Sequence, residues 1–283
     1  MKKVMAIHDI SGFGKCSLTV ALPVLSACKI ETTCLPTAVL STHTAIEGFT
    51  YRDLTEDIPA FHKHWQSLNL TFDAVYSGFL GSKEQISMVA DIFKTFKTKQ
   101  NLILVDPVMA DNGKMYSIFD NNFAREMAKL CNCADIIVPN ITEASFLLGQ
   151  SYREGPYDKI YIEKMLKDLS KTLNVKKIIL TGVYFDNANL GAAAYDKDTD
   201  TAVYGFSKKV DGYFHGTGDL FGSCLLAAIL HGNGLKDSVQ FSCDFVKGSI
   251  DRTVRDKTNI NYGVNFEEGL EDYCRAIVNV NNY

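Results

Sequence analysis

Runs of apolar residues recur along the chain and alternate with longer segments in which apolar residues follow a helical spacing. The runs are short and rich in valine, isoleucine and threonine, which is typical of strands buried within a sheet. We predict strands at residues 4–9, 30–40, 74–79, 102–105, 134–138 and 177–180, and a hairpin formed by residues 190–195 and 201–206.

Helical spacing fills the segments between these runs. In residues 83–99, for example, Ile86, Val89 and Phe93 share one helical face. The alternation of strands and helices favours an α/β fold with three layers, in which helices cover both faces of a mostly parallel sheet. No repeat or linker divides residues 1–283, so we expect a single domain. We predict helices at residues 17–27, 59–68, 83–99, 119–130, 142–148, 157–173, 235–254 and 266–278, and one more after a glycine-rich turn that begins at residue 216.

This glycine-rich turn leads directly into an almost entirely apolar helix. Small residues let a ligand approach the backbone closely, and a helix N-terminus offers free N–H groups and the positive end of the helix dipole. Gly216, Thr217 and Gly218 are therefore predicted to form an anion site that suits a phosphate. Asp219 stands beside them in the first turn, where it either stabilises the helix dipole or acts as a general base.

Polar residues follow most of the predicted strands, and each one alone is explained by a turn at a strand end. Because the carboxyl ends of parallel strands meet at one edge of a sheet, together they predict a ligand site there. Their carboxylate and amide groups suit Mg²⁺, so we expect a site for a polyphosphate, a metal and an acceptor hydroxyl. The residues concerned are Asp9, Ser77, Asp106, Asn140, Glu143 and Thr181.

A second glycine-containing segment, residues 11–15, fits neither common phosphate-binding motif. A P-loop requires a glycine where Asp9 stands and a serine or threonine where Cys16 stands. The dinucleotide-binding fingerprint requires a glycine where Ser17 stands. We therefore predict an ordinary polar loop at residues 11–15.

Composition narrows the class of protein. Of the 283 residues, 46% are hydrophobic and 22% are charged, as in an ordinary globular protein with a sizeable core. The formal net charge of −4 gives no basic field for nucleic acid, and no apolar run is long enough to span a membrane. The eight cysteines include no C-x-x-C pair, so we expect reduced thiols, no zinc site and a cytoplasmic location.

Several segments together resemble the ribokinase superfamily, and within it the pyridoxal (vitamin B6) kinases and the hydroxymethylpyrimidine kinases. The resemblance extends over essentially the whole chain. It is carried by residues 216–221 (GTGDLF), 76–82 (YSGFLGS), 106–111 (DPVMAD) with Met115 and Tyr116, 134–140 (ADIIVPN) with Glu143, and 41–44 (STHT).

This resemblance implies a ribokinase-like fold and an ATP-dependent kinase that phosphorylates the hydroxymethyl group of pyridoxal, pyridoxamine or pyridoxine. It also implies Mg²⁺ and a homodimer, and leaves open whether a monovalent cation is needed. The residues implied in catalysis are Gly216, Thr217, Gly218 and Asp219. Those implied around the nucleotide are Asp106, Asp111, Asn140, Glu143, Thr181 and Gly182, with Asp106 and Glu143 at the metal. Those implied around the substrate are Asp9, Ser11, Leu40, His43, Thr44, Phe79 and Tyr116.

Departures from the pyridoxal kinase pattern leave the substrate open. Asp9 stands where these kinases usually have serine, and the segment that it begins is closer to the D-P-S-G of hydroxymethylpyrimidine kinases. Asp219 instead resembles the pyridoxal kinases, since many pyrimidine kinases have cysteine at this position. If Asp9 contacts the substrate ring, it favours pyridoxamine or an aminopyrimidine over pyridoxal. Otherwise it only caps the loop that follows it.

Other functions remain as alternatives: a hydroxymethylpyrimidine (phosphate) kinase, a sugar or nucleoside kinase of the same superfamily, and a binding protein without catalysis. Sugar kinases commonly carry a separate β-lid, for which residues 9–44 leave little room. An intact Asp219 beside the glycine-rich turn favours an enzyme over a binding protein. The polar segment at residues 111–116 predicts a lid that closes over the substrates.

Overall fold

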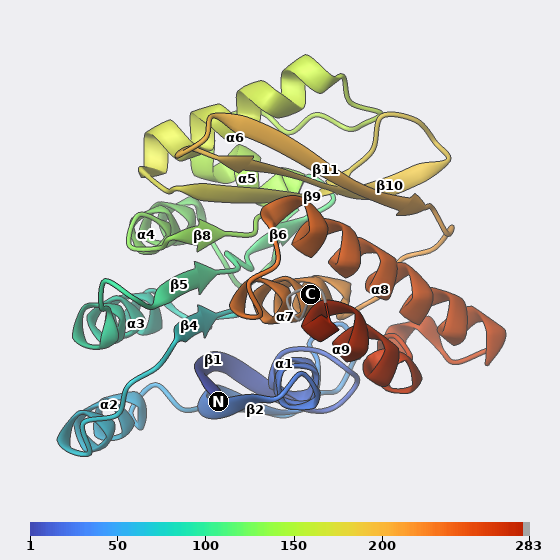
Figure 1. Ribbon diagram of the computed structural model, residues 1–283. Coiled ribbons are helices and arrows are strands. Elements are labelled where there is room, and N and C mark those ends of the chain that lie inside the picture. The colour runs from blue at the N-terminus through green and yellow to red at the C-terminus, as the bar shows by residue number, and fades with distance from the viewer. Residues whose placement is uncertain (280–283) are drawn as a thin grey trace.

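The computed structural model describes residues 1–279, whose strands form one large sheet and one small one. The large sheet has nine strands in the order β11-β10-β9-β8-β5-β4-β1-β2-β3 (Figure 1). These strands are β1 (Lys2–Phe13), β2 (Ile30–Thr42), β3 (Tyr51–Asp53), β4 (Ala74–Ser77), β5 (Leu102–Val105), β8 (Ile136–Ile137), β9 (Lys177–Val183), β10 (Asn189–Asp196) and β11 (Thr201–Lys208).

The six central strands, from β9 through to β2, are all parallel to their neighbours. Antiparallel strands complete the sheet at both edges: β3 pairs with β2, and the hairpin of β10 and β11 pairs with β9. The carboxyl ends of the parallel strands therefore lie along one edge of the sheet, as the sequence predicts.

Helices cover both faces of the sheet, which confirms the predicted three-layer α/β/α fold (Figure 1). One layer contains α2 to α6 and the other contains α1, α7, α8 and α9. The helices are α1 (Leu18–Ala27), α2 (Ile58–Ser67), α3 (Lys83–Phe96), α4 (Asn121–Cys131), α5 (Ile141–Leu148), α6 (Lys159–Leu173), α7 (Thr217–Leu230), α8 (Leu235–Arg255) and α9 (Leu270–Asn279).

Alternating side chains of the central strands feed two separate hydrophobic cores. In β1, for example, Met5 and Ile7 belong to the core under α2 to α6, whereas Val4 belongs to the core under α7. Successive residues of a strand point to opposite faces of the sheet, so a strand covered on both faces has to be apolar along its length. This explains why the central strands read as continuous apolar runs.

The N-terminal strand is longer than predicted, and the expected loop at residues 11–15 is wrong in its first part. Strand β1 continues to Phe13 because Ser11 pairs with Leu40 and Phe13 pairs with Thr42 of β2. An irregularity in register between His8 and Ile10 allows this extension. The pairing partner lies far away in sequence, and a local pattern of polar residues and glycine does not reveal it.

The predicted lid segment is a hairpin, which we did not predict although its sequence contains a turn signal. Strands β6 (Ala110–Asp111) and β7 (Lys114–Met115) pair as a separate two-stranded sheet. The two residues between them, Asn112 and Gly113, have positive φ angles of 49° and 75°. Asn-Gly with positive φ at both positions is the preferred sequence of a tight two-residue β-turn.

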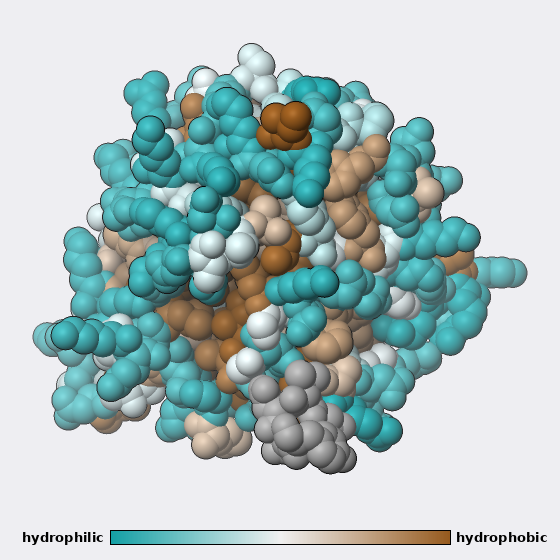
Figure 2. Space-filling model, turned by 45° about the horizontal axis from the view of Figure 1, so that its top comes forward, coloured by the Kyte–Doolittle hydropathy of each residue, from teal (hydrophilic) through white to brown (hydrophobic). Residues whose placement is uncertain are grey.

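The segment after α8 is less regular than the predicted helix at residues 266–278. Two 3-10 turns, η1 (Ile260–Tyr262) and η2 (Glu267–Gly269), precede α9. The surface is mainly hydrophilic, with apolar side chains gathered near the centre of the face seen in Figure 2. Within residues 1–279, no helix combines the length and apolar character needed to cross a membrane.

Candidate active site

A cavity of about 410 Å³ lies at the edge of the sheet where the parallel strands end. It is bounded by the segments that follow β5, β8 and β9, by the lid hairpin and by the N-terminus of α7. All predicted catalytic and nucleotide-binding residues line it, together with one predicted substrate residue. These residues are Asp106, Asp111, Tyr116, Asn140, Glu143, Thr181, Gly182, Gly216, Thr217, Gly218 and Asp219.

The N-terminus of α7 faces this cavity with its first-turn backbone. The cap residue Gly216 is left-handed, with a φ of 74°, and α7 has no side-chain hydrogen bond at its N-terminal cap. A Cβ atom at this position would lie 1.9 Å from the carbonyl oxygen of Lys15, so only glycine fits. The free N–H groups of the first turn therefore remain available to an anion, as predicted.

Asp219 sits at this helix N-terminus with 15% of its side chain exposed. Its Oδ2 accepts a hydrogen bond from the backbone N–H of Ser17 at 2.9 Å. Burial raises the pKa of Asp219 from 3.8 to about 7, with a further upward effect from the charge of Asp9. A carboxylate with a pKa near 7 is well suited to accept and release a proton at neutral pH.

His8 lies beneath Asp219 and is completely buried. Its Nδ1 is 3.9 Å from Oδ1 of Asp219, and its ring packs edge-on against Tyr76 with the ring centres 4.4 Å apart. Room for the ring exists because residue 78 is glycine: a Cβ there would lie 2.2 Å from Nδ1. The structure thus places His8 directly against the candidate base.

Two buried carboxyl groups, those of Asp106 and Glu143, lie across the cavity from this helix. Glu143 accepts hydrogen bonds from the backbone N–H of Met109 at 3.1 Å and of Asn140 at 2.9 Å. Burial raises the pKa of Glu143 to about 8. The pKa of Asp106 is also raised, first by burial and then by the nearby negative charge of Glu143. Two desolvated carboxyls in each other's field favour a bound cation, so both residues fit the metal role.

These two carboxyls do not form a complete metal site on their own. The part of the chain that the structure describes contains no cluster of three or more histidine, cysteine or acidic side chains arranged to hold a metal ion. Mg²⁺ commonly takes one or two carboxylates and completes its ligands with water and phosphate oxygens. The pair therefore suits a metal that arrives with a polyphosphate.

Asn140 joins the strand end to the lid. Its side-chain oxygen accepts from the N–H of Glu143 and completes a capping box at the start of α5, while its Nδ2 donates to the carbonyl of Ala110 at 2.8 Å. The lid is held further by Gly113, whose N–H donates to the hydroxyl of Thr142 at 2.9 Å. Asn140, one of the predicted nucleotide residues, and Thr142 thus anchor the lid hairpin.

The remaining predicted substrate residues do not line this cavity; they cluster at the ends of β1, β2 and β4. Ser11 and Leu40 are paired neighbours and both are buried, whereas Thr44 is exposed and Phe79 is half-buried. His43 connects this group to the cavity, because its ring stacks on that of His215, a cavity residue, at 4.8 Å.

His43 uses both ring nitrogens within the protein. Nδ1 accepts from the N–H of Ala45 at 3.3 Å, so Nε2 carries the proton and donates to the carbonyl of Asn261 at 2.6 Å. The ring also stacks on His215 and only 8% of His43 is exposed, so little of the ring remains for a ligand. Met109, in the segment 106–111, is fully buried in the core.

Asp9 is buried and has no free oxygen directed at the cavity. Its Oδ1 accepts from the hydroxyl of Ser17 at 2.6 Å and its Oδ2 accepts from the hydroxyl of Ser11 at 3.1 Å. These contacts favour the second of the two roles considered for Asp9, in which it orders the loop that follows it.

Sequence reasoning missed the opposite wall of the cavity. Three lysines contribute positive charge: Lys208 at the end of β11, Lys209 directly after it, and Lys247 on α8. Apolar side chains of this wall are Leu190, Val210, Phe214, Val246 and Ile250. The signal available in the sequence is the pair Lys208-Lys209, shortly after the predicted strand at 201–206.

The lysine of the rejected P-loop segment lies away from the cavity lining. Lys15 donates to Asn265 at 3.1 Å and pairs with Glu267 at 2.9 Å. Its backbone N–H also bonds to the carbonyl of Tyr262. These contacts agree with the conclusion that residues 11–15 are not a phosphate-binding loop.

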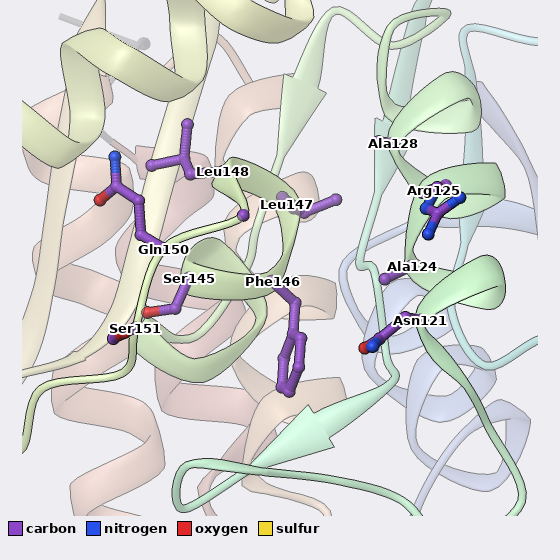
Figure 3. A pocket seen from close by; sticks show the side chains of 11 residues that line it. Asn121, Ala124, Arg125, Ala128, Ser145, Phe146, Leu147, Leu148, Gln150 and Ser151 are labelled. Atoms are coloured by element: carbon purple, nitrogen blue, oxygen red, sulfur yellow. The ribbon is translucent and has the colours of Figure 1, made fainter.

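A second hollow, of about 570 Å³, lies between α4 and the C-terminal end of α5 (Figure 3). Its lining includes Asn121, Arg125, Ser145, Phe146 and Gln150, and none of the predicted site residues. Its lining residues include no carboxylate, and the N-terminus of α4 at its wall is capped by Asp120, which accepts from the N–H of Phe123. It is therefore not the candidate active site.

Similarity to known proteins decides the family. A profile of the phosphomethylpyrimidine kinase family matches residues 31–265. The chain belongs to this family. Pyridoxal kinase of Dictyostelium discoideum, for instance, is 32% identical over 170 residues, which are 56% of this chain and 54% of that protein.

A second relative represents the other group of kinases that the sequence resembles. A hydroxymethylpyrimidine/phosphomethylpyrimidine kinase of Haemophilus influenzae is 30% identical over 181 residues, 61% of this chain and 63% of that protein. The chain thus aligns with between about half and two thirds of the length of these two relatives. The predicted resemblance to pyridoxal and hydroxymethylpyrimidine kinases is confirmed.

Solved structures extend this similarity over nearly the whole fold. A crystal structure ascribed to a phosphomethylpyrimidine kinase of Bacteroides thetaiotaomicron has a TM-score of 0.93 and 34% identity, covering 96% of this chain and 93% of that one. A second crystal form of the Bacteroides protein, with pyridoxal, has a TM-score of 0.89 and 33% identity, covering 97% and 96%. The similarity in fold to this family therefore extends over nearly the whole chain.

Proposed function

We propose that this protein is an ATP-dependent kinase that phosphorylates the hydroxymethyl group of a vitamin B6 form, pyridoxal, pyridoxamine or pyridoxine. The observation that carries the proposal is Asp219, a carboxyl with a pKa of about 7 in the first turn of a helix whose N–H groups face a cavity. A base beside an anion site is the arrangement that phosphoryl transfer to a hydroxyl requires.

In this reaction Oδ1 of Asp219 takes the proton of the hydroxymethyl group while the oxygen attacks the γ-phosphorus and ADP departs. Oδ1 is the oxygen for this role because Oδ2 accepts the N–H of Ser17. The N–H groups at Thr217 and Gly218 stabilise charge on the transferred phosphoryl group. Most of the rate acceleration comes from positioning and charge neutralisation, since phosphoryl transfer needs little covalent chemistry from the protein.

The wall that the sequence analysis missed suits the nucleotide. Its apolar side chains offer a slot for the adenine ring, and Lys208, Lys209 and Lys247 offer positive charge for phosphates. Asp106 and Glu143 would hold Mg²⁺, which neutralises phosphate charge when it is bound. A requirement for a monovalent cation is left open.

The substrate ring belongs on the other side of Asp219, among the residues at the ends of β1, β2 and β4. Phe79, which is half-buried, provides apolar surface there, whereas Leu40 is only 3% exposed and the ring of His43 is already stacked on His215. The Bacteroides relative, with pyridoxal in one crystal form, supports a pyridine substrate.

The second candidate is a hydroxymethylpyrimidine (phosphate) kinase. The family profile and the Haemophilus relative favour it, as does the Asp9-Ile10-Ser11-Gly12 segment. Both candidates use the same base and the same nucleotide site, and they differ in the ring that carries the hydroxymethyl group.

A panel of acceptors with Mg-ATP tests the proposal. Purified protein is assayed for ADP release and product mass with pyridoxal, pyridoxamine, pyridoxine and hydroxymethylpyrimidine. We expect the highest kcat/KM with a B6 form, and pyridoxamine or pyridoxine to be used at least as well as pyridoxal. Turnover of the pyrimidine alone would transfer the assignment to the second candidate, and no turnover of any acceptor would refute both.

We extend the proposal to a cytoplasmic homodimer. The edge strand β3 is exposed along its length, and a second copy would cover such an edge. Sedimentation equilibrium distinguishes a dimer from a monomer of 31.4 kDa. Cell fractionation tests the location.

A further inference from the structure

Ser17 connects two acidic residues that are far apart in sequence. Its backbone N–H donates to Oδ2 of Asp219 at 2.9 Å, and its hydroxyl donates to Oδ1 of Asp9 at 2.6 Å. Both Ser17 and Asp9 are at least 95% buried. A short hydrogen bond to a carboxylate in such surroundings is among the stronger ones in proteins.

The backbone of Ser17 is held in an unfavourable conformation to make these bonds. Its φ of 53° and ψ of −131° lie outside the regions that suit a residue with a Cβ atom. Such a conformation persists where the surroundings fix it, and here both neighbouring segments do. Lys15 is bonded to Tyr262 and packed against Gly216, while α1 begins at Leu18.

We propose that Ser17 and Asp9 are positioning residues for the base: the Asp9 carboxylate fixes the Ser17 hydroxyl, and the N–H of Ser17 in turn fixes the Asp219 carboxylate with Oδ1 toward the acceptor hydroxyl. The inference rests on the proposed function, since it assigns Asp219 as the base. It also assigns Asp9 to the base rather than to the substrate ring, because both of its oxygens are engaged by serine hydroxyls.

The electrostatic effect of this pair on Asp219 has two parts of opposite sign. The hydrogen bond from Ser17 lowers the pKa of Asp219, whereas the negative charge of Asp9 raises it. Removing one part at a time should therefore move the pKa in opposite directions. The other titratable groups that face or lie near Asp219 are His8, Cys16, Tyr76 and Asp106.

Two variants separate these parts. Ser17→Ala deletes the hydroxyl that Asp9 holds, so the N–H is no longer fixed against Asp219. We expect kcat to fall about tenfold, with KM for ATP within about twofold of wild type. The acidic limb of the kcat/KM profile should move to higher pH by about half a unit. Ser17→Gly, which also lacks the hydroxyl but tolerates the backbone conformation, replaces it if the alanine variant does not fold.

Asp9→Asn keeps an oxygen that can accept from the Ser17 hydroxyl but removes the charge. Its acidic limb should move to lower pH by about half a unit or more. A matched control is Ser170→Ala, which removes the hydrogen bond from a buried serine hydroxyl to the carbonyl of Val175 in the opposite helical layer. It should lower stability without moving the limb.

The same variants distinguish the inference from a substrate role of Asp9. If Asp9 acts through Ser17, kcat/KM changes by the same factor for every accepted substrate. If instead the ratio of kcat/KM values among pyridoxal, pyridoxamine and pyridoxine changes while the acidic limb of the pH profile does not move, Asp9 contacts the substrate ring and the inference is overturned. The inference is also overturned if the acidic limb of the kcat/KM profile does not move in either Ser17→Ala or Asp9→Asn.

A measurement without turnover keeps this result separate from the proposed function. In protein labelled with ¹³C at aspartate carboxyls, the resonance missing from Asp219→Asn belongs to Asp219. Its titration midpoint should rise in Ser17→Ala and fall in Asp9→Asn, even if none of the tested acceptors is phosphorylated. An unchanged midpoint in both variants contradicts the positioning role, whatever the activity of the enzyme is.

Discussion

Nδ1 of His8 lies 3.9 Å from Oδ1 of Asp219, yet the two side chains do not form an ion pair. Burial lowers the pKa of His8 to about 3, so the ring is neutral at physiological pH. Neither ring nitrogen has a hydrogen-bond partner among the described residues. The base therefore has no cation from His8 to hold it ionised, and burial dominates its pKa.

The first prediction concerns the pH dependence of activity. Because Asp219 must be ionised to accept a proton and burial raises its pKa to about 7, kcat/KM should fall as the pH drops below about 7. A profile measured from pH 5 to 9 checks this. An acidic limb near 4, the ordinary range of a carboxyl, would mean that Asp219 is not the group that titrates.

The second prediction concerns the base itself. Asp219→Asn keeps the size of the side chain and an acceptor for the N–H of Ser17, but the amide cannot accept the proton. We expect kcat to fall roughly 10²–10⁴-fold, the usual range for loss of a general base. ATP affinity, measured by calorimetry, should stay near that of wild type, and a kcat within a factor of two of wild type contradicts the assignment.

The third prediction is that the same substitution stabilises the folded protein at neutral and higher pH. A carboxyl whose pKa rises from 3.8 to about 7 on folding holds more protons in the folded than in the unfolded chain between these values. The free energy of unfolding of the wild type therefore decreases as the pH rises through this window. Asp219→Asn should lack this decrease, and urea unfolding at pH 4 and pH 8 tests it.

Much of the fold could be predicted from the sequence because local pattern and tertiary context agree. Residues 102–105 form a strand with the predicted limits, since an apolar run at the centre of a covered sheet leaves no other choice. The uncapped N-terminus of α7 at Gly216 was likewise predictable, because small residues directly before an apolar helix offer no side chain to cap the N–H groups of its first turn.

The parts that could not be predicted depend on contacts between distant segments. Ser17 and Asp219 are 202 positions apart, and serine gives no signal that its backbone will take a positive φ to reach a carboxylate. Strand β1 runs through the polar Ser11 only because Leu40 of β2 pairs with it. The role of Asp9 was left open for the same reason, since its two serine partners are identified by geometry rather than by spacing.

The fourth prediction concerns the metal. Activity should require Mg²⁺ or a similar hard cation and disappear in excess EDTA, because Asp106 and Glu143 offer only part of a metal site. Glu143→Ala should raise the Mg²⁺ concentration needed for half-maximal rate.

Glu143 also caps α5 and bonds to Met109, so its removal has a structural effect too. Asp106→Asn serves as the matched variant, since Asp106 takes no part in that cap. A raised Mg²⁺ requirement in both variants supports the metal role. A change confined to the variant that loses the cap assigns Glu143 to the helix and the lid instead.

The last prediction concerns the lid hairpin at residues 110–115. It is held at one side by Gly113, which donates to Thr142, and at the other by Tyr213, whose hydroxyl donates to Asp111 at 2.7 Å. Tyr213 lies three residues before Gly216, so this second contact joins the lid to the N-terminus of α7 across the cavity. We expect the lid to close fully over bound substrates and to exclude water, so that ATP hydrolysis without an acceptor is slow.

Hydrogen exchange tests this closure. Amides of residues 110–116 should gain protection when nucleotide and acceptor are both bound, whereas the turn between β10 and β11, outside the cavity lining, should not change. Thr142→Val removes the acceptor for Gly113, so lid amides should exchange faster in the ligand-free variant. It should also raise the ratio of ATP hydrolysis to phosphoryl transfer, because a loosened lid admits water. Equal lid protection with and without substrates would show that the hairpin is a fixed wall of the cavity.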